Sequence, residues 1–478
     1  MTNLEALQQI HAITTAALAA PPSSATPIYV PAGGPLQHVL DAAPQDARVQ
    51  LEAGATYPGQ FVHPGRGISL STRDAVPVGR ATAQDSVATL VSLTKGPALR
   101  VKPGAVGGLC ASVALKSTDP TSEVCVIGDP LATQASHQPR DFTLDRLVIL
   151  GDPAKGQKRG VALHGVNLAL LNSHIGDIKF PQQDTQAVYI LNGPGPYFVR
   201  NNLLEGAGEN LMSGGDTARI LGCIPSDILI EGNTITKPLA WRGQAWQVKN
   251  LLEFKSARRV TVRGNDIGYC WHAAQDGYAI LISPRNQNGD APYTVVEDID
   301  IEYNVIHDVA NVIKITGDDD THPSQRTRRI GIRHNLAIAS YQQYGKDNGY
   351  GRFLHLGRAP QGITVQHNTA ITDGYTCVYS SPGGSVKESP GSTWIGNALY
   401  HRRYGFKCEG GTFASYYPGA EFAGNVIAGG TGYPSGNWTP AVAEFEAGFV
   451  DLAGKDYRIK PEVAWAGAGV DLSKVPTW

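Results

Sequence analysis

Hydrophobic and polar residues alternate with a period of two in short segments along most of the chain. Clear examples are YAILIS at 278–283, NVIKIT at 311–316 and RFLHLG at 352–357. Such alternation is typical of a β-strand with one buried and one exposed face. Because no helical pattern separates these segments, the sequence predicts a chain built from many short strands.

A short motif recurs through the same region. In each copy, alternating apolar residues are followed by a small or polar residue, an asparagine and a further apolar pair, as in ILIEGNTI, VTVRGNDI and IDIEYNVI. The copies follow one another at intervals of 28 to 39 residues, and their asparagines are Asn172, Asn202, Asn233, Asn265, Asn304, Asn335, Asn368, Asn397 and Asn425. A unit of about 30 residues cannot bury its apolar face alone, so neighbouring units must stack. The repeat therefore predicts a solenoid whose strands pair from coil to coil.

The repeated asparagine is predicted to be structural. Asparagine tolerates the left-handed backbone region, and its amide can hydrogen-bond to nearby backbone at a corner between strands. On stacked coils, equivalent amides can also hydrogen-bond to one another as a ladder. We therefore exclude the nine asparagines from the candidate functional residues.

The stacked I-x-I-x-G-N-x-I pattern resembles the right-handed parallel β-helix of the pectin lyase-like superfamily, over roughly residues 45–430. The segment VQLEAGATYPGQF at 49–61 also resembles the first coil of many such proteins. This resemblance implies an all-β fold, a right-handed parallel β-helix. The superfamily includes polysaccharide lyases, glycoside hydrolases and phage tailspikes, so the resemblance alone does not fix an activity.

Both ends of the chain depart from the repeat. Apolar residues at helical spacing over 3–19 predict a short capping helix, and residues 1–44 are expected to form an N-terminal cap. Exposed strand edges at the end of a solenoid need such a cover. Residues 45–430 are expected to form the β-helix, and 431–478 an irregular C-terminal cap rich in Trp and Pro.

Composition narrows the range of partners. The 55 glycines and the 17% of charged residues favour many tight turns and few solvated helices. A formal net charge of −2 provides no bulk field to recruit nucleic acid, and no apolar run approaches a membrane span, so neither partner is expected. Residues 1–20 lack the basic and uninterrupted apolar regions of a Sec signal. An extracellular or virion-surface location is the expectation.

The six cysteines are too sparse for a disulfide scaffold and show no CxxC zinc spacing. Buried free thiols are the favoured interpretation. Whether Cys110 and Cys125 are bridged is left open by the sequence.

The outward-facing residues of one strand per coil are predicted to stack into a flat face. Aligning the strands on their inward apolar residues gives the outward set Glu253, Lys255, Leu281, Ser283, Lys314, Thr316, His355, Tyr379, Lys407 and Glu409. Two unusually polar loops, at 283–290 and 316–329, follow these strands. Long loops on one edge of a solenoid are where function tends to lie. The arrangement predicts a walled groove suited to a linear polymer.

Lyase-type cleavage of a uronic polymer needs a cation or metal to neutralise the sugar carboxylate, a base and a proton donor. The predicted catalytic residues are Lys314, His355, Arg285, Tyr379 and Asp318. Predicted substrate-binding residues are Glu253, Lys255, His322, Arg326 and Lys407. The run Asp318, Asp319 and Asp320 could hold Ca²⁺ through oxygen ligands.

Hydrolysis is the second chemistry, and it needs two carboxylic acids. Asp318–Asp320 with His355 one coil later resembles the polygalacturonase-type arrangement of an Asp pair followed by a His. The Asn-x-Asp, Gly-His-Gly and Arg-x-Lys elements of that family are absent from the corresponding coils. A structural alternative is that the Asp run is a solvated turn whose side chains cap backbone N–H groups, with Arg326 in a surface ion pair.

Two functional hypotheses follow. In the first, the protein binds an acidic extracellular polysaccharide and cleaves it by a lyase-type reaction. In the second, it is a structural or adhesive spike of a phage or phage-like particle, a homotrimer or a partner of other virion proteins, without catalysis. A scaffold with no ligand at this face is a third possibility.

Overall fold

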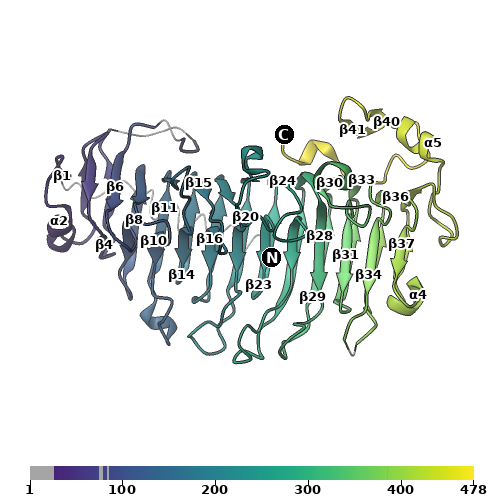
Figure 1. Cartoon of the computed structure of the whole chain (residues 1–478), viewed down its shortest axis with the longest axis horizontal. Helices are drawn as coiled ribbons and strands as arrows, with labels where there is room; N and C mark the ends of the chain where they lie inside the picture. Colours follow the sequence, from purple (N-terminus) through teal and green to yellow (C-terminus); the bar gives the residue numbers. More distant parts are fainter. Residues whose placement is uncertain (1–25, 75–78, 83–84, 385) are drawn as a thin grey trace. The chain divides into compact units, whose positions relative to one another are not determined.

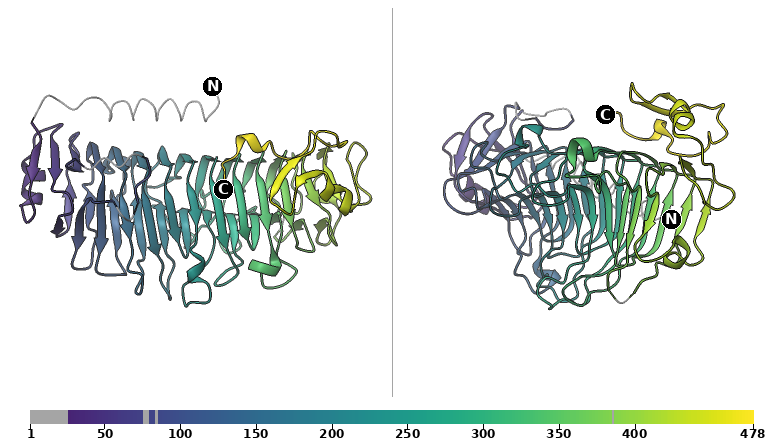
Figure 2. Two further views of the ribbon diagram at one scale, coloured as in Figure 1. Left: turned by 90° about the horizontal axis from the view of Figure 1, so that it is seen from above. Right: turned by 45° about the vertical axis from the view of Figure 1, so that its right-hand side comes forward.

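The computed structural model describes residues 26–74, 79–82, 85–384 and 386–478. The predicted helix at 3–19 lies outside these residues. The chain divides into two compact units, Met1–Gln247 and Val248–Trp478. In each unit, short strands form three parallel sheets, and successive coils contribute one strand to each sheet (Figures 1 and 2). The prediction of an all-β, right-handed parallel β-helix is confirmed.

The first unit contains three sheets, named A, B and C in the order in which the chain visits them. Sheet A consists of β1 (Ile28–Val30), β2 (Arg48–Leu51), β5 (Ser69–Thr72), β8 (Val106–Ala111), β11 (Arg140–Asp145), β14 (Val166–Leu171), β17 (Tyr197–Arg200) and β20 (Ser226–Glu231). Sheet B consists of β3 (Thr56–Pro58), β6 (Ala88–Ser92), β9 (Val113–Ser117), β12 (Val148–Leu150), β15 (His174–Ile178), β18 (Leu203–Gly206) and β21 (Thr234–Thr236). Sheet C consists of β4 (Phe61–His63), β7 (Leu99–Val101), β10 (Glu123–Ile127), β13 (Arg159–Leu163), β16 (Gln186–Ile190) and β19 (Glu209–Ser213). Three short helical elements interrupt the coils, namely α2 (Leu36–Ala42), η1 (Ala135–His137) and η2 (Leu239–Trp241).

The second unit repeats the three-sheet pattern with the same names. Sheet A consists of β23 (Ala257–Arg263), β26 (Val296–Glu302), β29 (Arg328–Arg333), β32 (Gln361–Gln366), β35 (Thr393–Ile395) and β38 (Glu421–Ala423). Sheet B consists of β24 (Asp266–Cys270), β27 (Val305–Val309), β30 (Leu336–Ala339), β33 (Thr369–Thr372), β36 (Ala398–Tyr400) and β39 (Val426–Ala428). Sheet C consists of β22 (Leu252–Phe254), β25 (Tyr278–Ile282), β28 (Asn311–Thr316), β31 (Leu354–Gly357), β34 (Val378–Ser381) and β37 (Phe406–Cys408).

The predicted asparagine ladder is present. In the second unit, the Oδ1 atom of Asn304 accepts hydrogen bonds from the backbone N–H and the amide of Asn265, at 3.0 and 2.9 Å. Asn304 in turn donates to Asn335 in the same way, at 3.0 Å for both bonds. These side chains are buried, so each bond is made out of contact with water. The ladder supplies hydrogen bonds to the corner between sheets A and B on each coil of the second unit from Asn265 to Asn425.

The expected backbone role of the asparagine is wrong at most positions. The left-handed conformation belongs to the preceding residue, such as Tyr303 with φ 55° or His334 with φ 53°. At Asn172 the motif is displaced by one residue, because Asn172 itself has φ 50° and Ser173 takes the ladder position, with its N–H donating to Asn202. The asparagine is thus selected for its amide rather than for its φ angle.

The C-terminal segment packs along one side of the second unit instead of only closing its end. Phe445 of α5 (Val442–Ala447), Phe449 of β40 (Phe449–Asp451) and Trp465 share an apolar cluster with residues of β27, β30, β36 and β39. Trp478 at the end of the chain stacks on His307 of β27, with ring centroids 4.8 Å apart. The remaining elements of the unit are α3 (Tyr341–Tyr344), α4 (Phe413–Tyr416), η3 (Leu472–Lys474) and β41 (Asp456–Ile459), which is antiparallel to β40. The predicted division at residue 430 stays a prediction.

His307 on sheet B makes the stability of the second unit depend on pH. Its Nε2 and Nδ1 atoms lie 2.8 and 2.7 Å from carboxylate oxygens of Asp266 and Asp308. Burial opposes protonation, but these two hydrogen bonds outweigh burial and raise the pKa of His307 to about 8. A raised pKa in the folded state contributes stability that is fully present below the unfolded pKa of about 6.5 and is lost as pH rises through the folded value.

We expect the free energy of unfolding to fall by up to about 2 kcal/mol between about pH 6 and about pH 9 through this group. Urea denaturation at the two pH values measures the change. His307→Gln should remove this part of the pH dependence, whereas replacing the exposed His38 by Gln should leave it intact. An unchanged pH dependence in His307→Gln would refute the assignment.

The six cysteines are free, which answers the question left open for Cys110 and Cys125. Both side chains are buried, and burial raises the pKa of the Cys110 thiol to about 12. Among the described residues, no helix is long and apolar enough to cross a membrane.

Candidate functional site

Sheet C of the second unit presents one row of outward side chains that runs across six coils. The strand register pairs Glu253 with Leu281, Leu281 with Lys314 and Lys314 with His355. The row continues from His355 to Tyr379 and from Tyr379 to Lys407. This is the row predicted from the alternation of inward and outward residues, and its assembly is confirmed.

A groove of about 660 Å³ lies over the first four of these strands. The segment 274–276, which precedes β25, lines it at the amino-terminal edge of the strands. The loops after β25 and β28 line it at the opposite edge through Arg285, Gln287, Asp318 and Asp320. The groove thus has a floor of strands and a wall of loops at each edge, as the sequence predicts.

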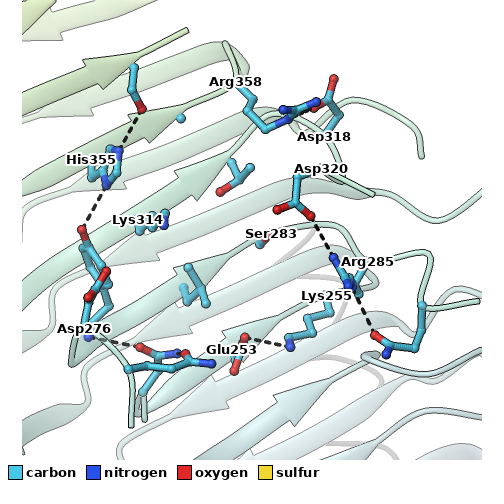
Figure 3. Close-up of a pocket in the computed structure, with 18 of the residues that line it drawn as sticks. Glu253, Lys255, Asp276, Ser283, Arg285, Lys314, Asp318, Asp320, His355 and Arg358 are labelled. Carbon is cyan, nitrogen blue, oxygen red and sulfur yellow. Dashed lines mark hydrogen bonds and ion pairs between the residues drawn. The ribbon is translucent and has the colours of Figure 1, made fainter. Parts of the chain in front are cut away.

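Seven of the predicted site residues line the groove: Glu253, Lys255, Arg285, Lys314, Asp318, Asp320 and His355. The five that do not line it are Asp319, His322, Arg326, Tyr379 and Lys407. Figure 3 shows Lys314 between His355 and the pair formed by Glu253 and Lys255, with Arg285 and Asp320 across the groove.

Glu253 and Lys255 form an ion pair at the start of the groove, with 3.1 Å between Nζ and Oε1. The side chain of Glu253 is only 1% exposed although it belongs to the outward row. Its Oε2 atom has no hydrogen-bond partner among the described residues. A buried carboxylate next to an ammonium holds that ammonium in place, so Glu253 fixes the position of Lys255.

The loop carboxylates are engaged with arginines and backbone. Asp319 is buried, accepts hydrogen bonds from the N–H groups of Asn286 and Thr321 at 2.7 and 2.9 Å, and lies 3.1 Å from Arg285. Asp320 also binds Arg285, at 2.9 Å. Asp319 therefore joins the two loops to each other, which supports the capping role left open as an alternative.

Asp318 is bound by two guanidinium groups, those of Arg358 and Arg326. Arg326 also donates to the backbone carbonyls of Arg358 and Ala359, at 2.8 and 2.7 Å. Arg326 therefore braces the loop, and its predicted role in binding substrate has no support in this geometry.

The predicted calcium site does not fit the arrangement of the three aspartates. Asp318 faces Arg358 and Arg326, whereas Asp319 and Asp320 face Arg285. Within the residues that the structure describes, no group of three or more His, Cys, Asp or Glu side chains is placed to hold a metal ion. Arginine side chains already neutralise the three aspartates. We therefore assign no Ca²⁺ ion to this loop.

Lys314 differs from the other cations of the groove. Lys255, Arg285 and Arg358 each pair with a carboxylate. In the described part of the chain, Lys314 has no carboxylate within ion-pair distance, and its Nζ lies 5.8 Å from the ring centroid of Tyr278. The floor of the groove therefore carries one positive charge that no acidic side chain neutralises.

His355, next to Lys314 in the row, is held as a neutral imidazole. Its Nδ1 and Nε2 atoms each lie 3.0 Å from a hydroxyl oxygen, that of Tyr278 and that of Ser381. Burial, together with the charges of Lys314 and Arg352, lowers the pKa of His355 to about 3. An imidazole with so low a pKa is a weak base, so within the predicted catalytic role of His355 the structure favours orienting Tyr278 over acting as the base.

Tyr278, Asp276, Ser381 and Arg358 are groove residues that the sequence analysis missed. Tyr278 has the parity of the inward residues, since it is in register with Asn311 while Ile280 is in register with Ile313. It stands at the first position of β25 and lines the groove. Its hydroxyl contacts His355, and burial raises the pKa of the phenol. The alternation of inward and outward residues assigns Tyr278 to the inward face. This pattern alone therefore cannot identify it as a groove residue.

Comparisons with known proteins were made for the whole chain. No protein-family model matches it, and no curated protein matches it. Among solved structures, the PL6 family alginate lyase AlyGC superimposes with a TM-score of 0.61 at 13% identity, over 94% of this chain and 57% of that chain. This chain thus spans 57% of the length of that lyase chain.

The catalytic unit of a GH87 α-1,3-glucanase from Streptomyces thermodiastaticus gives a TM-score of 0.50 at 15% identity, over 87% of this chain and 70% of that chain. A tailspike protein of the Acinetobacter baumannii bacteriophage Fri1, a capsular polysaccharide depolymerase, gives 0.41 at 9% identity, over 87% of this chain and 62% of that chain. At these identities the similarity establishes the fold alone. Function must be argued from the site.

Proposed function

We propose that the protein binds an acidic polysaccharide in the groove of its second unit. The observation that carries the proposal is the unpaired ammonium of Lys314 on the groove floor. A partly enclosed charge without a counter-ion is costly, and a ligand carboxylate compensates it. The ligand class is therefore an acidic sugar.

The form of the groove supports a linear polymer over a small molecule. Its floor follows four coils, from Glu253 on β22 to His355 on β31, and the loops wall it only at the edges of the strands. Its lining is mainly polar, with hydroxyl, amide and charged groups in place of the apolar walls of a typical small-molecule pocket. The alginate lyase and the glucanase that share the fold are both named for polysaccharide substrates, which supports a polysaccharide as the ligand.

Cleavage by β-elimination is the reaction that the groove supports better than hydrolysis. Hydrolysis needs two carboxyl groups available to the substrate. Four carboxylates line the groove, but Glu253 pairs with Lys255, Asp318 with Arg358 and Asp320 with Arg285, which leaves only Asp276 without a cation among the described residues. Elimination removes the proton from the carbon next to the sugar carboxylate, forms a carbon–carbon double bond with that electron pair and breaks the bond to the glycosidic oxygen, which takes up a proton. It therefore needs a cation at the sugar carboxylate and a group that carries the proton from the carbon to the oxygen.

Lys314 supplies the cation, and the phenol of Tyr278, hydrogen-bonded to the neutral His355, is the proton-transfer group beside it. Tyr379 lies outside the groove, so Tyr278 takes its place in the proposal.

A panel of polymers of matched length tests both parts of this proposal. We expect binding to uronate polymers and not to neutral glucans, with an affinity that falls as salt is added, because the contact is electrostatic. Elimination would also produce unsaturated sugar ends that absorb ultraviolet light. Equal binding of charged and neutral polymers would overturn the acidic ligand. Binding without absorbance or shortening of the polymer would leave adhesion as the function and overturn the lyase reaction.

The adhesive-spike hypothesis places the polysaccharide in the same groove as the lyase hypothesis. It differs in expecting the protein to assemble with other chains. A homotrimer, virion partners and an extracellular or virion-surface location remain part of that proposal. The mass of the protein in solution measures the first of these, and a strict monomer would count against a spike.

A further inference from the structure

The outward row of sheet C continues past the groove toward the C-terminal coils. His355 is in register with Tyr379, and Tyr379 is in register with Lys407 on β37. Neighbouring strands lie about 4.8 Å apart, so Lys407 is about 14 Å along the row from Lys314. A polymer that enters the groove and follows the row would meet these coils next.

Tyrosines gather beside this continuation, at the edge where the strands of sheet C begin. Tyr341 opens α3, Tyr375 precedes β34 and Tyr404 precedes β37. Their ring centroids are separated by 6.4 Å between Tyr341 and Tyr375 and by 6.5 Å between Tyr375 and Tyr404. Tyr404 is 42% exposed. Three successive coils therefore place an aromatic ring at the same edge, and we call these three residues the tyrosine tract.

Two cations lie against the rings of this tract. The guanidinium of Arg403 is 5.4 and 5.2 Å from the ring centroids of Tyr375 and Tyr404. The ammonium of Lys407 is 4.9 Å from the ring centroid of Tyr404 and 5.8 Å from that of Tyr379. An aromatic face holds a cation in position without cancelling its charge, so both groups remain able to bind an anion.

Arg403 and Lys407 differ from the arginines on sheet A of the same unit in having no carboxylate partner among the described residues. There, Arg328 binds Glu297, and Arg329 binds both Glu297 and Asp298. Among the described residues, neither Arg403 nor Lys407 has a carboxylate within ion-pair distance. Positive charge is thus left without an acidic side chain at the point where the outward row continues.

We infer that the tyrosine tract, with Arg403 and Lys407, is a second binding stretch for the same acidic polysaccharide. Sugar rings pack on the exposed tyrosine faces, and their carboxylates bind Arg403 and Lys407. This inference rests on the proposed function, because it takes the polymer from the groove as its ligand. It predicts that affinity depends on chain length, since only a ligand of about 14 Å or more reaches from Lys314 to Lys407.

The test compares a uronate disaccharide with a long uronate polymer, in the whole protein and in the double variant Tyr404→Ala, Lys407→Gln. Both side chains are exposed, so the variant should fold. We expect about tenfold weaker binding of the polymer and unchanged binding of the disaccharide. The matched control is Tyr29→Ala, Arg73→Gln in the first unit. It removes a tyrosine of β1 of similar exposure, 39%, with its own cation at 4.2 Å, Arg73, which follows β5 and lies 3.4 Å from Asp74.

The outcomes separate the two proposals. If the wild-type protein binds neither ligand, the proposed function fails. If it binds both, and the Tyr404 and Lys407 variant weakens polymer binding no more than the control does, the second stretch is refuted while the groove stands. An equal loss for disaccharide and polymer also refutes it, because the tract would then act on the groove itself.

Discussion

Replacing Lys314 by Gln is expected to weaken binding of an acidic polymer roughly tenfold or more, because a hydrogen bond between charged groups contributes about 1.5 to 3 kcal/mol. Lys314 lines the groove and is the cation there without an acidic partner in the described chain. Gln keeps much of the length and a donor but removes the charge. Titration of the polymer at low salt measures the loss.

The control for this experiment is Lys95→Gln, which removes the same charge from an exposed position in the first unit. The control separates loss of a specific contact from a change in net charge. If Lys314→Gln binds and cleaves the polymer as well as Lys95→Gln does, the groove is not the binding site. If it binds as well but cleavage is lost, Lys314 acts in the reaction rather than in recognition.

Replacing Asn304 by Ala is expected to lower the free energy of unfolding of the second unit by about 3 to 5 kcal/mol, since it leaves several buried partners without a hydrogen bond. The Nδ2 atom of Asn304 donates to the carbonyl of Val262 and to Asn335, at 2.9 and 3.0 Å. Its Oδ1 atom accepts from the N–H and the amide of Asn265. All these groups lie out of contact with water.

Chemical denaturation measures this change, with Asn288→Ala as the matched control because Asn288 lies exposed in a loop of the same unit. Because coils contact mainly their neighbours, partial unfolding is expected, so limited proteolysis should show cleavage near the substituted coil first. A denaturation midpoint for Asn304→Ala equal to that of Asn288→Ala would show that the ladder is not a source of stability.

The first feature that the sequence determined is the ladder and the register that it implies. Once each coil places its asparagine at one corner, the alternation of Ile280, Ile313 and Leu354 fixes which side chains point outward. The row from Glu253 to Lys407 therefore follows from the amino-acid sequence alone. The alternation with a period of two marks the strands, and the repeat of about 30 residues marks the coils. Both patterns can be read from the sequence without knowledge of the fold.

One extension of the ladder escaped the sequence analysis. Asn437 continues it, since its Oδ1 atom accepts from the N–H and the amide of Asn425, both at 2.9 Å. The spacing from Asn425 is 12 residues instead of about 30. A short loop that folds back can fill a ladder position without completing a coil, and no periodic pattern shows it.

The residues that define the candidate site chemically were decided by tertiary structure. The sequence placed three aspartates in one loop and suggested a shared calcium site, but the fold distributes them between Arg285 on one side and Arg326 and Arg358 on the other. Charge pairing across coils depends on loop conformations that have no period. The same reason kept Tyr278 from being recognised, since its role arises from a strand end and a hydroxyl contact with His355.

The sequence by itself thus determined the β-helix, the outward face of sheet C and the loops that line the groove. The reason is that stacked coils align equivalent positions of successive strands, so the alternation within each strand becomes a row of side chains across the sheet. Only the tertiary structure decided which charges in that row are neutralised. Lys255, Arg285 and Arg358 are paired, His355 is neutral through burial, and Lys314 is left as the cation that a ligand can bind. Ion pairing and burial depend on the distances between side chains on different coils. Those distances are set by the loop conformations of the folded chain, which have no repeating sequence pattern.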